Sequence, residues 1–531
     1  MSWKQLPLLT LATASLVFSA CAGSETGPGS PGNGGTTGSA GTTGSGGTTG
    51  VGGTTGVGGT SGSGGTMGVA GTIGSGGSVG PGGSGGSSGG SSAAGRGGNG
   101  GSSGGSTGTG GTSAQAGAGG GSGGVVGGGG RGGGAAGRGG TTGTGGTTGT
   151  GGTTGSGGSG TPSAENTGAN CNVTSAALLS AQNKKLPNPF VMHDGTTITT
   201  KAQWECRRNE IKADVEKYEI GPKQTPPTVA ATLSGKTLNV VVTVGSNSIT
   251  LSSPVSGSGS CVVVGMNGTT SLVSGCTEVA FMHDQVVTYT SGNTQTQGDP
   301  FYKLYPSLYG KIGNYSAWAW GISRIIDGLD QVKSQLNIDM TKVATWGCSY
   351  AGKMSMFGGA LDERVALTII EESGGGGIDS WRASQDFDTR TSMSTEKIDN
   401  TNYSWFMSSM KSLDPYKLPH DHHEVIAMIA PRATIILGNP GYVWLGDESG
   451  YKSTLAAVEV FKAMGVPDSI GYDFTGGHSH CGPPTTQMQS VATYVNRFLK
   501  GGTGATGVAI KPNQSGFDLT ADTDWTTPTL Q

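Results

Sequence analysis

The chain has 531 residues and a formal net charge of −3, and Gly supplies 106 of its residues, most of them before about residue 165. Charged residues are scattered rather than gathered in blocks, so no nucleic-acid partner and no polybasic membrane patch are indicated. No apolar run of about twenty residues occurs, which excludes a transmembrane helix and leaves a lipid as the only expected membrane anchor.

The first residues have the pattern of an export signal. Lys4 precedes a largely apolar stretch, residues 8–18, and small residues follow up to Cys21. A Cys at this point, followed at once by a Gly-rich segment, resembles a bacterial lipoprotein box. We expect residues 1–21 to be a lipoprotein-type signal peptide and Cys21 to be lipidated, which places the protein at the cell surface or the outer membrane. The alternative is an ordinary signal peptide and a secreted protein.

Residues 22–167 consist almost entirely of Gly, Thr and Ser. Such a segment has too little apolar surface to offset the entropy lost on ordering, so we expect a disordered linker. Gly does not recur at every third position, which excludes a collagen helix. A flexible chain of this length has an r.m.s. reach of about 65 Å, so the linker would act as a tether.

The remaining ~340 residues are long enough for one large core. Residues 237–252 alternate and are β-branched, which predicts a hairpin. Short buried strands are predicted at 260–265 and 278–282, and a helix at 316–336 from the spacing of its apolar residues. Strands then alternate with helices: strands at 343–346, 365–370, 433–437 and 470–474, helices at 351–361, 453–464 and 485–499.

This alternation predicts an α/β fold: a three-layer sandwich with a mostly parallel central sheet and an antiparallel N-terminal edge. We place this domain at residues 168–501 and expect residues 502–531 to form a polar C-terminal tail.

The cysteines indicate disulfides. Seven is an odd number for an exported protein, and six remain when Cys21 is set aside: Cys171, Cys206, Cys261, Cys276, Cys348 and Cys481. Six allow three disulfides in an oxidising compartment. Spacing leaves the pairing open, although Cys261 and Cys276 are close enough to close a short hairpin. No Cys-x-x-Cys spacing occurs, so a cysteine metal site is not expected.

Ser349 is the candidate nucleophile. It follows a predicted strand, is flanked by Gly347 and Gly352, and precedes a predicted helix. This arrangement is typical of a nucleophile elbow, a tight turn that exposes the hydroxyl above the sheet edge. The usual Gly-x-Ser-x-Gly spacing is not met, because Ala351 stands at the fifth position.

Two further groups complete a candidate triad. Glu371 and Glu372 end the next apolar strand, where side chains reach the crevice in which α/β proteins bind ligands. His478 and His480 lie in a loop after the last predicted strand. The order Ser, acid, His is that of α/β-hydrolases and predicts a serine esterase that needs no cofactor.

The region from about residue 170 to 500 resembles the glucuronoyl esterases, carbohydrate esterase family 15. The matching stretches include Leu186-Pro-Asn-Pro-Phe, Trp204-Glu-Cys-Arg-Arg, Gly347-Cys-Ser, Glu372-Ser-Gly, Ile429-Ala-Pro-Arg, Trp444-Leu-Gly and Gly477-His-Ser-His-Cys. They favour Glu372 over Glu371 as the acid, and His480 over His478 as the base. The resemblance implies an enzyme that cleaves esters between (4-O-methyl)glucuronic acid of xylan and lignin alcohols in the plant cell wall. We expect it to be a monomer.

The resemblance also implies two disulfides, Cys171–Cys206 and Cys348–Cys481, and Cys261–Cys276 then follows by elimination. The second would tie the residue beside the nucleophile to the residue beside the base. Closing a loop of roughly 130 residues contributes about 4–5 kcal/mol in the chain-entropy model.

Individual binding residues follow from the same match. Lys353 corresponds to a lysine that hydrogen-bonds sugar hydroxyls, and Trp444 to a tryptophan that contacts the sugar. Tyr350 replaces an Arg that helps form the oxyanion hole; its backbone N–H is kept, but its hydroxyl is neutral. Losing one oxyanion donor costs about 10²–10³ in rate. Asn402 is the nearest polar substitute for a substrate-binding Glu.

Two other functions remain open from the sequence. The domain could be a carboxylesterase for acetyl, benzoyl or other small esters, or a surface protein that binds carbohydrate without catalysis. The cluster at residues 420–424, His-Asp-His-His-Glu, has metal-ligand chemistry. Alternate residues of so short a segment cannot all converge on one ion, so we expect no metal.

Overall fold

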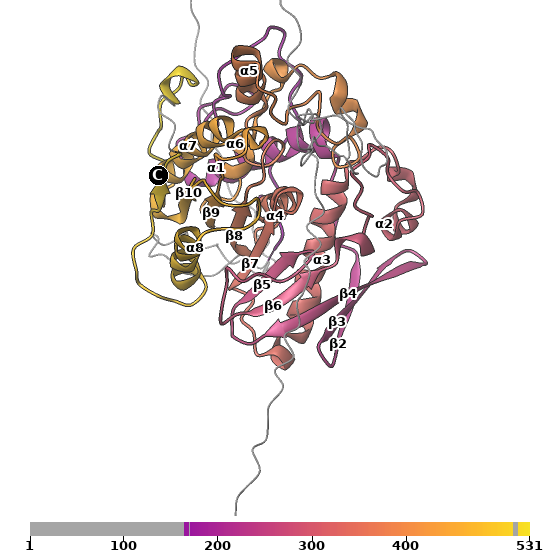
Figure 1. The fold of residues 1–531 in the computed structure, drawn as a ribbon. Helices are drawn as coiled ribbons and strands as arrows, with labels where there is room; N and C mark the ends of the chain where they lie inside the picture. Colours follow the sequence, from indigo (N-terminus) through magenta and orange to yellow (C-terminus); the bar gives the residue numbers. More distant parts are fainter. Residues whose placement is uncertain (1–163, 169, 513–518) are drawn as a thin grey trace, which may run out of the picture.

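A ten-stranded sheet runs through the part of the chain that the computed structural model describes, residues 164–168, 170–512 and 519–531 (Figure 1). The signal peptide, Cys21 and nearly all of the linker predicted above lie outside these residues. The strand order is β11-β10-β9-β8-β7-β5-β6-β4-β3-β2.

One edge of the sheet is an antiparallel meander of β2 (Thr228–Ser234), β3 (Thr237–Val244) and β4 (Asn247–Gly257). Val242 lies opposite Ile249 on the two strands of the predicted hairpin, which is therefore confirmed. β4 continues past the hairpin and pairs antiparallel with β6, so it joins the meander to the rest of the sheet.

The other strands are parallel: β5 (Val262–Met266), β6 (Thr277–Phe281), β7 (Val343–Cys348), β8 (Val365–Glu371), β9 (Ala433–Leu437), β10 (Ile470–Asp473) and β11 (Ala509–Ile510). The predicted α/β fold with an antiparallel N-terminal edge is thus confirmed. Because these strands run in one direction, their carboxyl ends meet at a single edge, where the loops carry the candidate catalytic residues.

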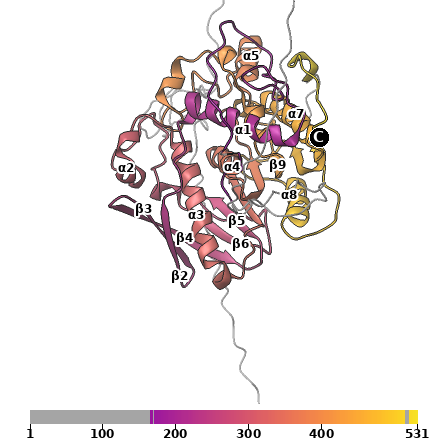
Figure 2. The same cartoon turned by 180° about the vertical axis from the view of Figure 1, so that it is seen from behind.

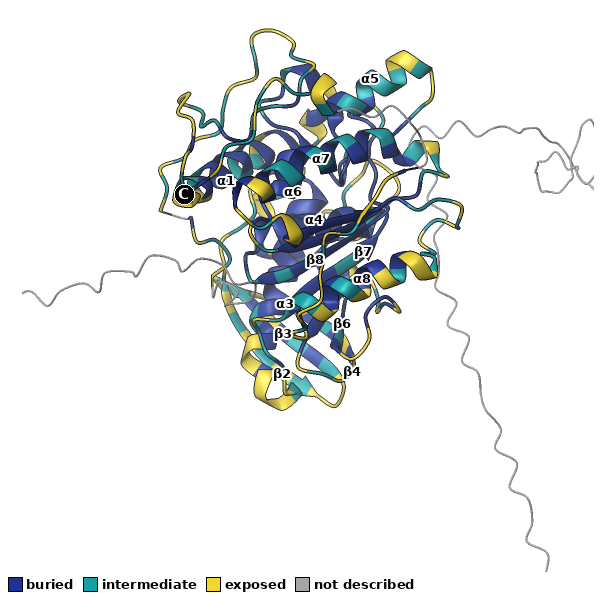
Figure 3. Cartoon of the chain, turned by 90° about the vertical axis from the view of Figure 1, so that its left-hand side faces the viewer, coloured by how far each residue is buried: buried dark blue, intermediate teal, exposed yellow. Residues whose placement is uncertain are grey.

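Successive side chains of each strand point to opposite faces, and this alternation builds two cores. Val264 and Ile436 belong to one core, Val263 and Ile435 to the other. The first core lies under α1 (Lys201–Val215), α3 (Asn314–Leu336), α4 (Tyr350–Leu361), α6 (His422–Ala427) and α7 (Asp447–Ala463); α8 (Thr485–Phe498) covers the second. The short α2 (Pro300–Leu304) and α5 (Trp381–Thr391) lie toward the rim. Figure 3 shows β7, β8 and α4 deeply buried at the centre.

The residues after 501 do not form a separate tail, contrary to our expectation. β11 pairs with β10 and extends the sheet. Near the end of the chain, Leu530 is buried and its N–H donates to the carbonyl of Ala463, and the indole of Trp525 donates to the carbonyl of Leu186. These apolar side chains bring the C-terminus against α7, as Figures 1 and 2 show from opposite sides.

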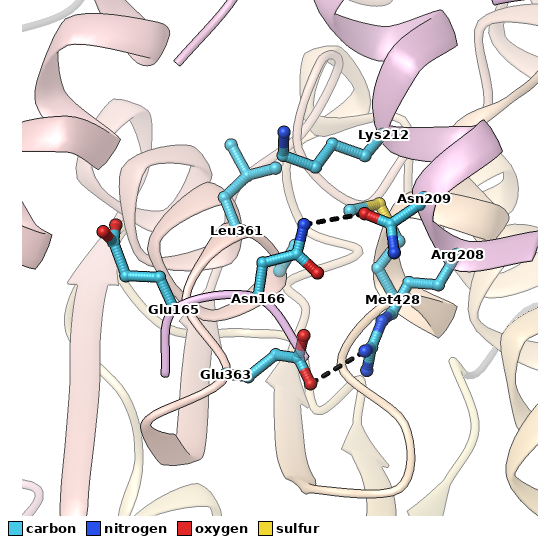
Figure 4. Close-up of a pocket in the computed structure, with 9 residues that line it drawn as sticks. Glu165, Asn166, Arg208, Asn209, Lys212, Leu361, Glu363 and Met428 are labelled. Atoms are coloured by element: carbon cyan, nitrogen blue, oxygen red, sulfur yellow. Dashed lines mark hydrogen bonds and ion pairs between the residues drawn. The ribbon is translucent and has the colours of Figure 1, made fainter. Parts of the chain in front are cut away.

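The chain enters the domain slightly earlier than predicted, at the edge opposite the candidate catalytic residues. Glu165 forms ion pairs with Lys223 and Arg324, at 2.6 and 2.8 Å. Beside it, Asn166 donates to Asn209, and Arg208 pairs with Glu363 around a small pocket (Figure 4). We call Glu165, Lys223, Arg324, Asp362 and Arg364 the entry clamp. None of the helices in the described part of the chain is long and apolar enough to cross a membrane.

Candidate active site

Ser349 lies in the turn between β7 and α4, with φ = 60° and ψ = −128°. A non-glycine residue seldom adopts this conformation, so the surrounding structure must impose it. The turn is crowded: a Cβ added to Gly347 would lie 2.1 Å from the carbonyl oxygen of Ala351, and one added to Gly352 would lie 2.5 Å from that of Glu371. The N–H of Ser349 donates to the same Glu371 carbonyl at 3.0 Å, which fixes the serine to the end of β8.

Glu372 and His480 meet at the same edge. Glu372 follows β8, and its N–H donates to the carbonyl of Leu437 at 2.8 Å. Its Oε2 lies 2.7 Å from His480 Nδ1, and a carboxylate there fixes the imidazole proton on Nδ1. His480 Nε2 is buried and makes no hydrogen bond to the described residues, so it is available to accept a proton.

A disulfide holds these groups together. Cys348–Cys481 joins residues 133 apart, with a Cα–Cα distance of 5.7 Å, and so ties the neighbour of Ser349 to the neighbour of His480. A ring nitrogen of His480 and the two sulfur atoms all lie within 4.8 Å of one another. Because both sulfur atoms are bonded in the disulfide, they offer no thiolate to a metal.

The remaining cysteines form Cys171–Cys206 and Cys261–Cys276, with Cα–Cα distances of 5.4 and 4.7 Å. All three disulfides pair as the sequence analysis expected. Such bonds persist in an oxidising compartment, which fits a protein that functions outside the cytoplasm.

His478 also lies near Glu372, with Nδ1 3.6 Å from Oε1. Its ring nitrogens, however, face the backbone carbonyls of Ser479 and Thr475, at 3.0 and 2.8 Å. The ring is therefore held by the loop, which leaves His480 as the better candidate for the base.

Glu371 bonds to a tryptophan rather than to a histidine. Its Oε2 accepts a hydrogen bond from the indole of Trp346 at 3.0 Å. Burial raises the pKa of Glu371 to about 8; the Trp346 bond opposes this rise, and the charge of Glu372 adds to it. A carboxyl that stays protonated at neutral pH cannot stabilise an imidazolium, so the geometry favours Glu372 as the acid.

Two more buried carboxyl groups, which sequence reasoning missed, lie close to Glu372 and to each other. Asp447 begins α7 and accepts the N–H of Asn439 at 3.1 Å. Burial and the charge of Glu372 raise its pKa to about 7. Asp379 is fully buried, and burial, with help from Asp447 and Glu396, raises its pKa well above the ordinary value. Asp447 at the start of α7 and Asp379 in the segment between β8 and α5 are brought together only by the tertiary fold.

Of the predicted sugar-binding residues, Lys353 follows Ser349 on α4 and Trp444 lies beside His480. Lys353 is buried one helical turn after Ser349, and its Nζ lies 2.9 Å from Glu396 Oε2 and 5.6 Å from the ring centre of Trp405. The ring of Trp444 stands edge-on to that of His480, with centres 4.9 Å apart. Glu396, which sequence reasoning missed, links the two: its N–H donates to the carbonyl of Trp444 at 3.2 Å.

The side chain of Asn402 forms hydrogen bonds that connect two loops next to these residues. Its Nδ2 donates to the carbonyl of Thr290 at 3.0 Å, and its Oδ1 accepts from the N–H and the hydroxyl of Ser404. The amide thus holds two loops together, and direct contact between Asn402 and a substrate stays a prediction.

Tyr350 is the first residue of α4. Its Oη lies 3.1 Å from His283 Nε2 and 3.4 Å from Asn267 Nδ2. Its ring packs on Tyr289, with centres 4.4 Å apart. Its backbone N–H belongs to the first turn of α4, where N–H groups are not used within the helix and point along its axis.

The side chains at residues 420–424 diverge. His420 and His422 both direct Nε2 to Glu219, at 2.7 and 3.0 Å, whereas Glu424 pairs with Arg207 at 2.7 Å. Burial alone would raise the pKa of Glu219, but His422 and His420 hold it far below its ordinary value. The cluster is a buried ion-pair network under α6 rather than a shared ligand set.

The strand order, the strained serine turn and the histidine–carboxylate pair at the same sheet edge define a hydrolase of the α/β-hydrolase class. Comparison with known proteins narrows this class. Residues 232–465 match the family model described as "Glucuronyl esterase, fungi".

A 4-O-methyl-glucuronoyl methylesterase of Thermothelomyces thermophilus is 38% identical over 337 residues, which cover 61% of this chain and 83% of the relative. The crystal structure of the Sporotrichum thermophile glucuronoyl esterase is 34% identical and covers 68% of this chain and 100% of that one, with a TM-score of 0.64. The Hypocrea jecorina catalytic domain is 32% identical and covers 67% and 99%, with a TM-score of 0.61. The chain belongs to the glucuronoyl esterases of carbohydrate esterase family 15 and is a carboxylic ester hydrolase.

Proposed function

We propose that the protein hydrolyses esters between (4-O-methyl)glucuronic acid on xylan and alcohols of lignin, with Ser349, His480 and Glu372 as its catalytic triad. The main support is the 2.7 Å contact between Glu372 Oε2 and His480 Nδ1, at the edge where Ser349 is held in its strained turn. A serine-to-alanine variant of the Sporotrichum thermophile enzyme, 34% identical, was solved in complex with methyl 4-O-methyl-β-D-glucopyranuronate, which supports both the serine and the uronate.

The residues have distinct roles in this reaction. His480 Nε2 removes the hydroxyl proton as Ser349 Oγ attacks the ester carbonyl, and the backbone N–H of Tyr350 stabilises the oxyanion. His480 then protonates the departing alcohol. A water molecule, deprotonated by His480, next releases the uronic acid from Ser349. Glu372 keeps the imidazole in the required tautomer and stabilises its cationic form.

Lys353, on the helix that follows Ser349, and Trp444, beside His480, would bind the uronic acid. The ammonium group of Lys353 has three protons to donate to sugar hydroxyls, and the Trp444 ring offers an apolar surface. Glu396 holds the Lys353 ammonium in place, because the two groups are buried and 2.9 Å apart.

Export and anchoring form a separate part of the proposal. The three disulfides support folding outside the cytoplasm. Lipidation of Cys21 would tether the esterase to the cell surface through the Gly-rich linker. Intact-mass analysis of the membrane fraction should show a mature chain that starts at a diacylated Cys21, and an unmodified mature chain would contradict the anchor.

The enzymatic proposal is tested by comparing benzyl glucuronoate with acetylated xylan as substrates. The wild type should hydrolyse the uronate ester and leave the acetyl groups largely intact. Ser349→Ala should lose at least about 10⁴ in kcat, whereas Ser409→Ala, a change at an exposed serine, should leave it unchanged. Preferential deacetylation by the wild type would overturn the substrate, and uronate turnover by Ser349→Ala would overturn the nucleophile.

A further inference from the structure

The side chain of Asn439 contacts both the loop of the acid and the loop of the base. Asn439 stands two residues after β9, which lies between β8 and β10 in the sheet, and it is fully buried. Its Nδ2 lies 3.4 Å from Glu372 Oε2, the oxygen that meets His480 Nδ1 at 2.7 Å. The same nitrogen lies 3.1 Å from the carbonyl oxygen of His478. One amide group therefore joins the two loops.

The partners of this amide fix its orientation. Asn439 Oδ1 accepts the N–H of Gly441 at 3.2 Å, and a backbone N–H can only donate. A carboxylate oxygen and a backbone carbonyl can only accept, so the nitrogen must face Glu372 and the carbonyl of His478. The two amide protons are thus directed at the loops that carry the candidate acid and base.

The ring of His478 meets the same amide. Its Nε2 lies 2.8 Å from the carbonyl oxygen of Thr475, so this nitrogen carries the proton when the ring is neutral. Nδ1 of the neutral ring then has a lone pair, and Asn439 Nδ2 lies 3.2 Å from it. The amide therefore holds His478 by its ring and by its backbone, two residues before the candidate base.

The backbone of this segment is fixed from three sides. The N–H of Asn439 donates to Asp447 Oδ1 at 3.1 Å, at the start of α7. One residue earlier, the N–H of Gly438 donates to the carbonyl of Asp473 in β10 at 3.0 Å, and the carbonyl of Gly438 accepts from Gln487 of α8 at 2.8 Å. The position of the amide is thus set by the fold and needs no substrate.

The carboxylate of Glu372 depends on the donors at one of its oxygens. Its Oε1 makes no hydrogen bond to the described residues, so the contacts at Oε2 decide how the group is turned. The base loop has a further support from the same segment, because Tyr442 Oη accepts the N–H of His480 at 3.1 Å.

We propose that Asn439 is a positioning residue for ester hydrolysis, whose amide holds the Glu372 carboxylate and the His478 loop so that Glu372 and His480 keep their contact. The inference rests on the proposed function and deepens it. Asn439 acts through the acid and the base rather than on the substrate, because its side chain is fully buried.

Asn439→Asp tests this role, because it keeps the shape of the side chain and replaces the donor nitrogen by an acceptor oxygen. With two carboxylates face to face, kcat should fall by about 10²-fold at about pH 8, while KM changes by less than about twofold. Burial and the neighbouring Glu372 and Asp447 favour protonation of the new carboxyl as the pH falls. A protonated carboxyl has one O–H to donate, so the loss relative to wild type should shrink to about tenfold near pH 6.

Asn209 supplies the matched control. It is also a buried asparagine whose Nδ2 donates to a carbonyl, that of Glu205 at 2.9 Å, and it lies beside the small pocket near the entry clamp (Figure 4). Asn209→Asp makes the same chemical change and should leave kcat unchanged at both pH values.

A double-mutant cycle shows whether Asn439 acts through Glu372. In the Glu372→Gln background, Asn439→Asp should lower kcat by less than about threefold further, because the partner carboxylate is gone. A smaller pair of variants covers the case in which Asn439→Asp does not fold. Asn439→Ser keeps a hydroxyl that can donate and should be several-fold faster than Asn439→Ala.

All rates are measured with p-nitrophenyl acetate as well as benzyl glucuronoate. Absence of uronate turnover alone would overturn the proposed substrate, and the acetate rates would still test Asn439. Wild-type kcat in Asn439→Asp, a loss that is equal at pH 6 and pH 8, a full loss in the Glu372→Gln background, or equal rates in the Ser and Ala variants would overturn the positioning role. Melting temperatures identify any variant that loses activity by unfolding.

Discussion

Carboxyl groups are buried at both ends of the parallel strands, but their pKa values shift in opposite directions at the two ends. In the entry clamp, burial alone would raise the pKa of Glu165, yet Lys223 and Arg324 hold it below its ordinary value. Asp362 is likewise buried, and Arg364 lowers its pKa to about 2. At the carboxyl edge, by contrast, burial raises the pKa of Glu371 to about 8, because no Lys or Arg pairs with it among the described residues.

The difference shows that burial alone does not set the pKa of a carboxyl group. Where guanidinium and ammonium groups surround it, the charge is kept and helps to hold the chain together. Where they are lacking, burial raises the pKa of carboxyl groups such as Glu371 and Asp447. Of Glu371, Glu372 and Asp447, Glu372 is the one that bonds to His480. The ion pairs at the amino ends of the parallel strands therefore support stability, whereas the carboxyl ends hold the candidate catalytic groups.

The largest expected effect separates the two adjacent glutamates. Glu372→Gln should lower kcat by about 10⁴-fold, because the amide neither fixes the His480 tautomer nor stabilises its cation. Glu371→Gln should change kcat by less than about threefold, because a neutral group replaces a neutral group. Kinetics on benzyl glucuronoate measure both, and an equal loss in the two variants would contradict the assignment of the acid.

The next largest effect is expected from a substitution in the entry clamp. Arg324→Met removes a fully buried guanidinium and should cost about 3 kcal/mol of unfolding free energy, since it leaves Glu165 and Asp327 without this partner. The exposed pair of Lys333 with Asp330 supplies the control, and Lys333→Met should cost less than about 0.5 kcal/mol. Urea unfolding gives both values. A loss of kcat in folded Arg324→Met would show that the two edges are not separate in function.

A third effect concerns the pH dependence of stability. The folded state binds the Glu371 proton more tightly than the unfolded chain does, since the pKa rises from 4.5 to about 8. Its contribution to stability is therefore complete below about pH 4.5 and is lost as the pH rises through about 8. Between pH 5 and pH 9 the wild type should lose on the order of 4 kcal/mol more than Glu371→Gln. A difference between the two proteins that does not change with pH would contradict this.

The smallest effect is expected at the oxyanion site. Tyr350→Arg should not raise kcat, because it removes the hydroxyl that contacts His283 and Asn267 and the ring that packs on Tyr289. Its kcat should be equal to or below that of the wild type on benzyl glucuronoate. A gain of tenfold or more would show that the tyrosine side chain lowers the rate.

Much of the fold could be predicted because its strands are apolar and β-branched. The hairpin of β3 and β4 and the buried strands β5 to β10 carry this pattern. Helix α1 was missed because its buried side chains include Arg207, Glu210 and Asp214, whose burial depends on distant partners rather than on a local apolar stripe. The two residues of β11 are too few to leave any periodic signal.

The candidate triad could be predicted because its members lie at strand ends that parallel topology brings to one edge. Glu396, Asp379 and His283 could not, since they come from loops whose positions are set by packing. Glu396 meets Lys353 across 43 residues, and His283 meets Tyr350 across 67. The resemblance to the family indicated that position 350 matters, but the groups that contact Tyr350 could be identified only from the structure.

Covalent labelling with a fluorophosphonate tests the central claim most directly, because it reports the activated serine without assuming a substrate. We predict one label per molecule on Ser349, labelling at least about 10³-fold slower in His480→Ala, and a rate close to wild type in Arg324→Met. Labelling at another serine, or equal rates in wild type and His480→Ala, would contradict the assignment of Ser349 and His480 as nucleophile and base.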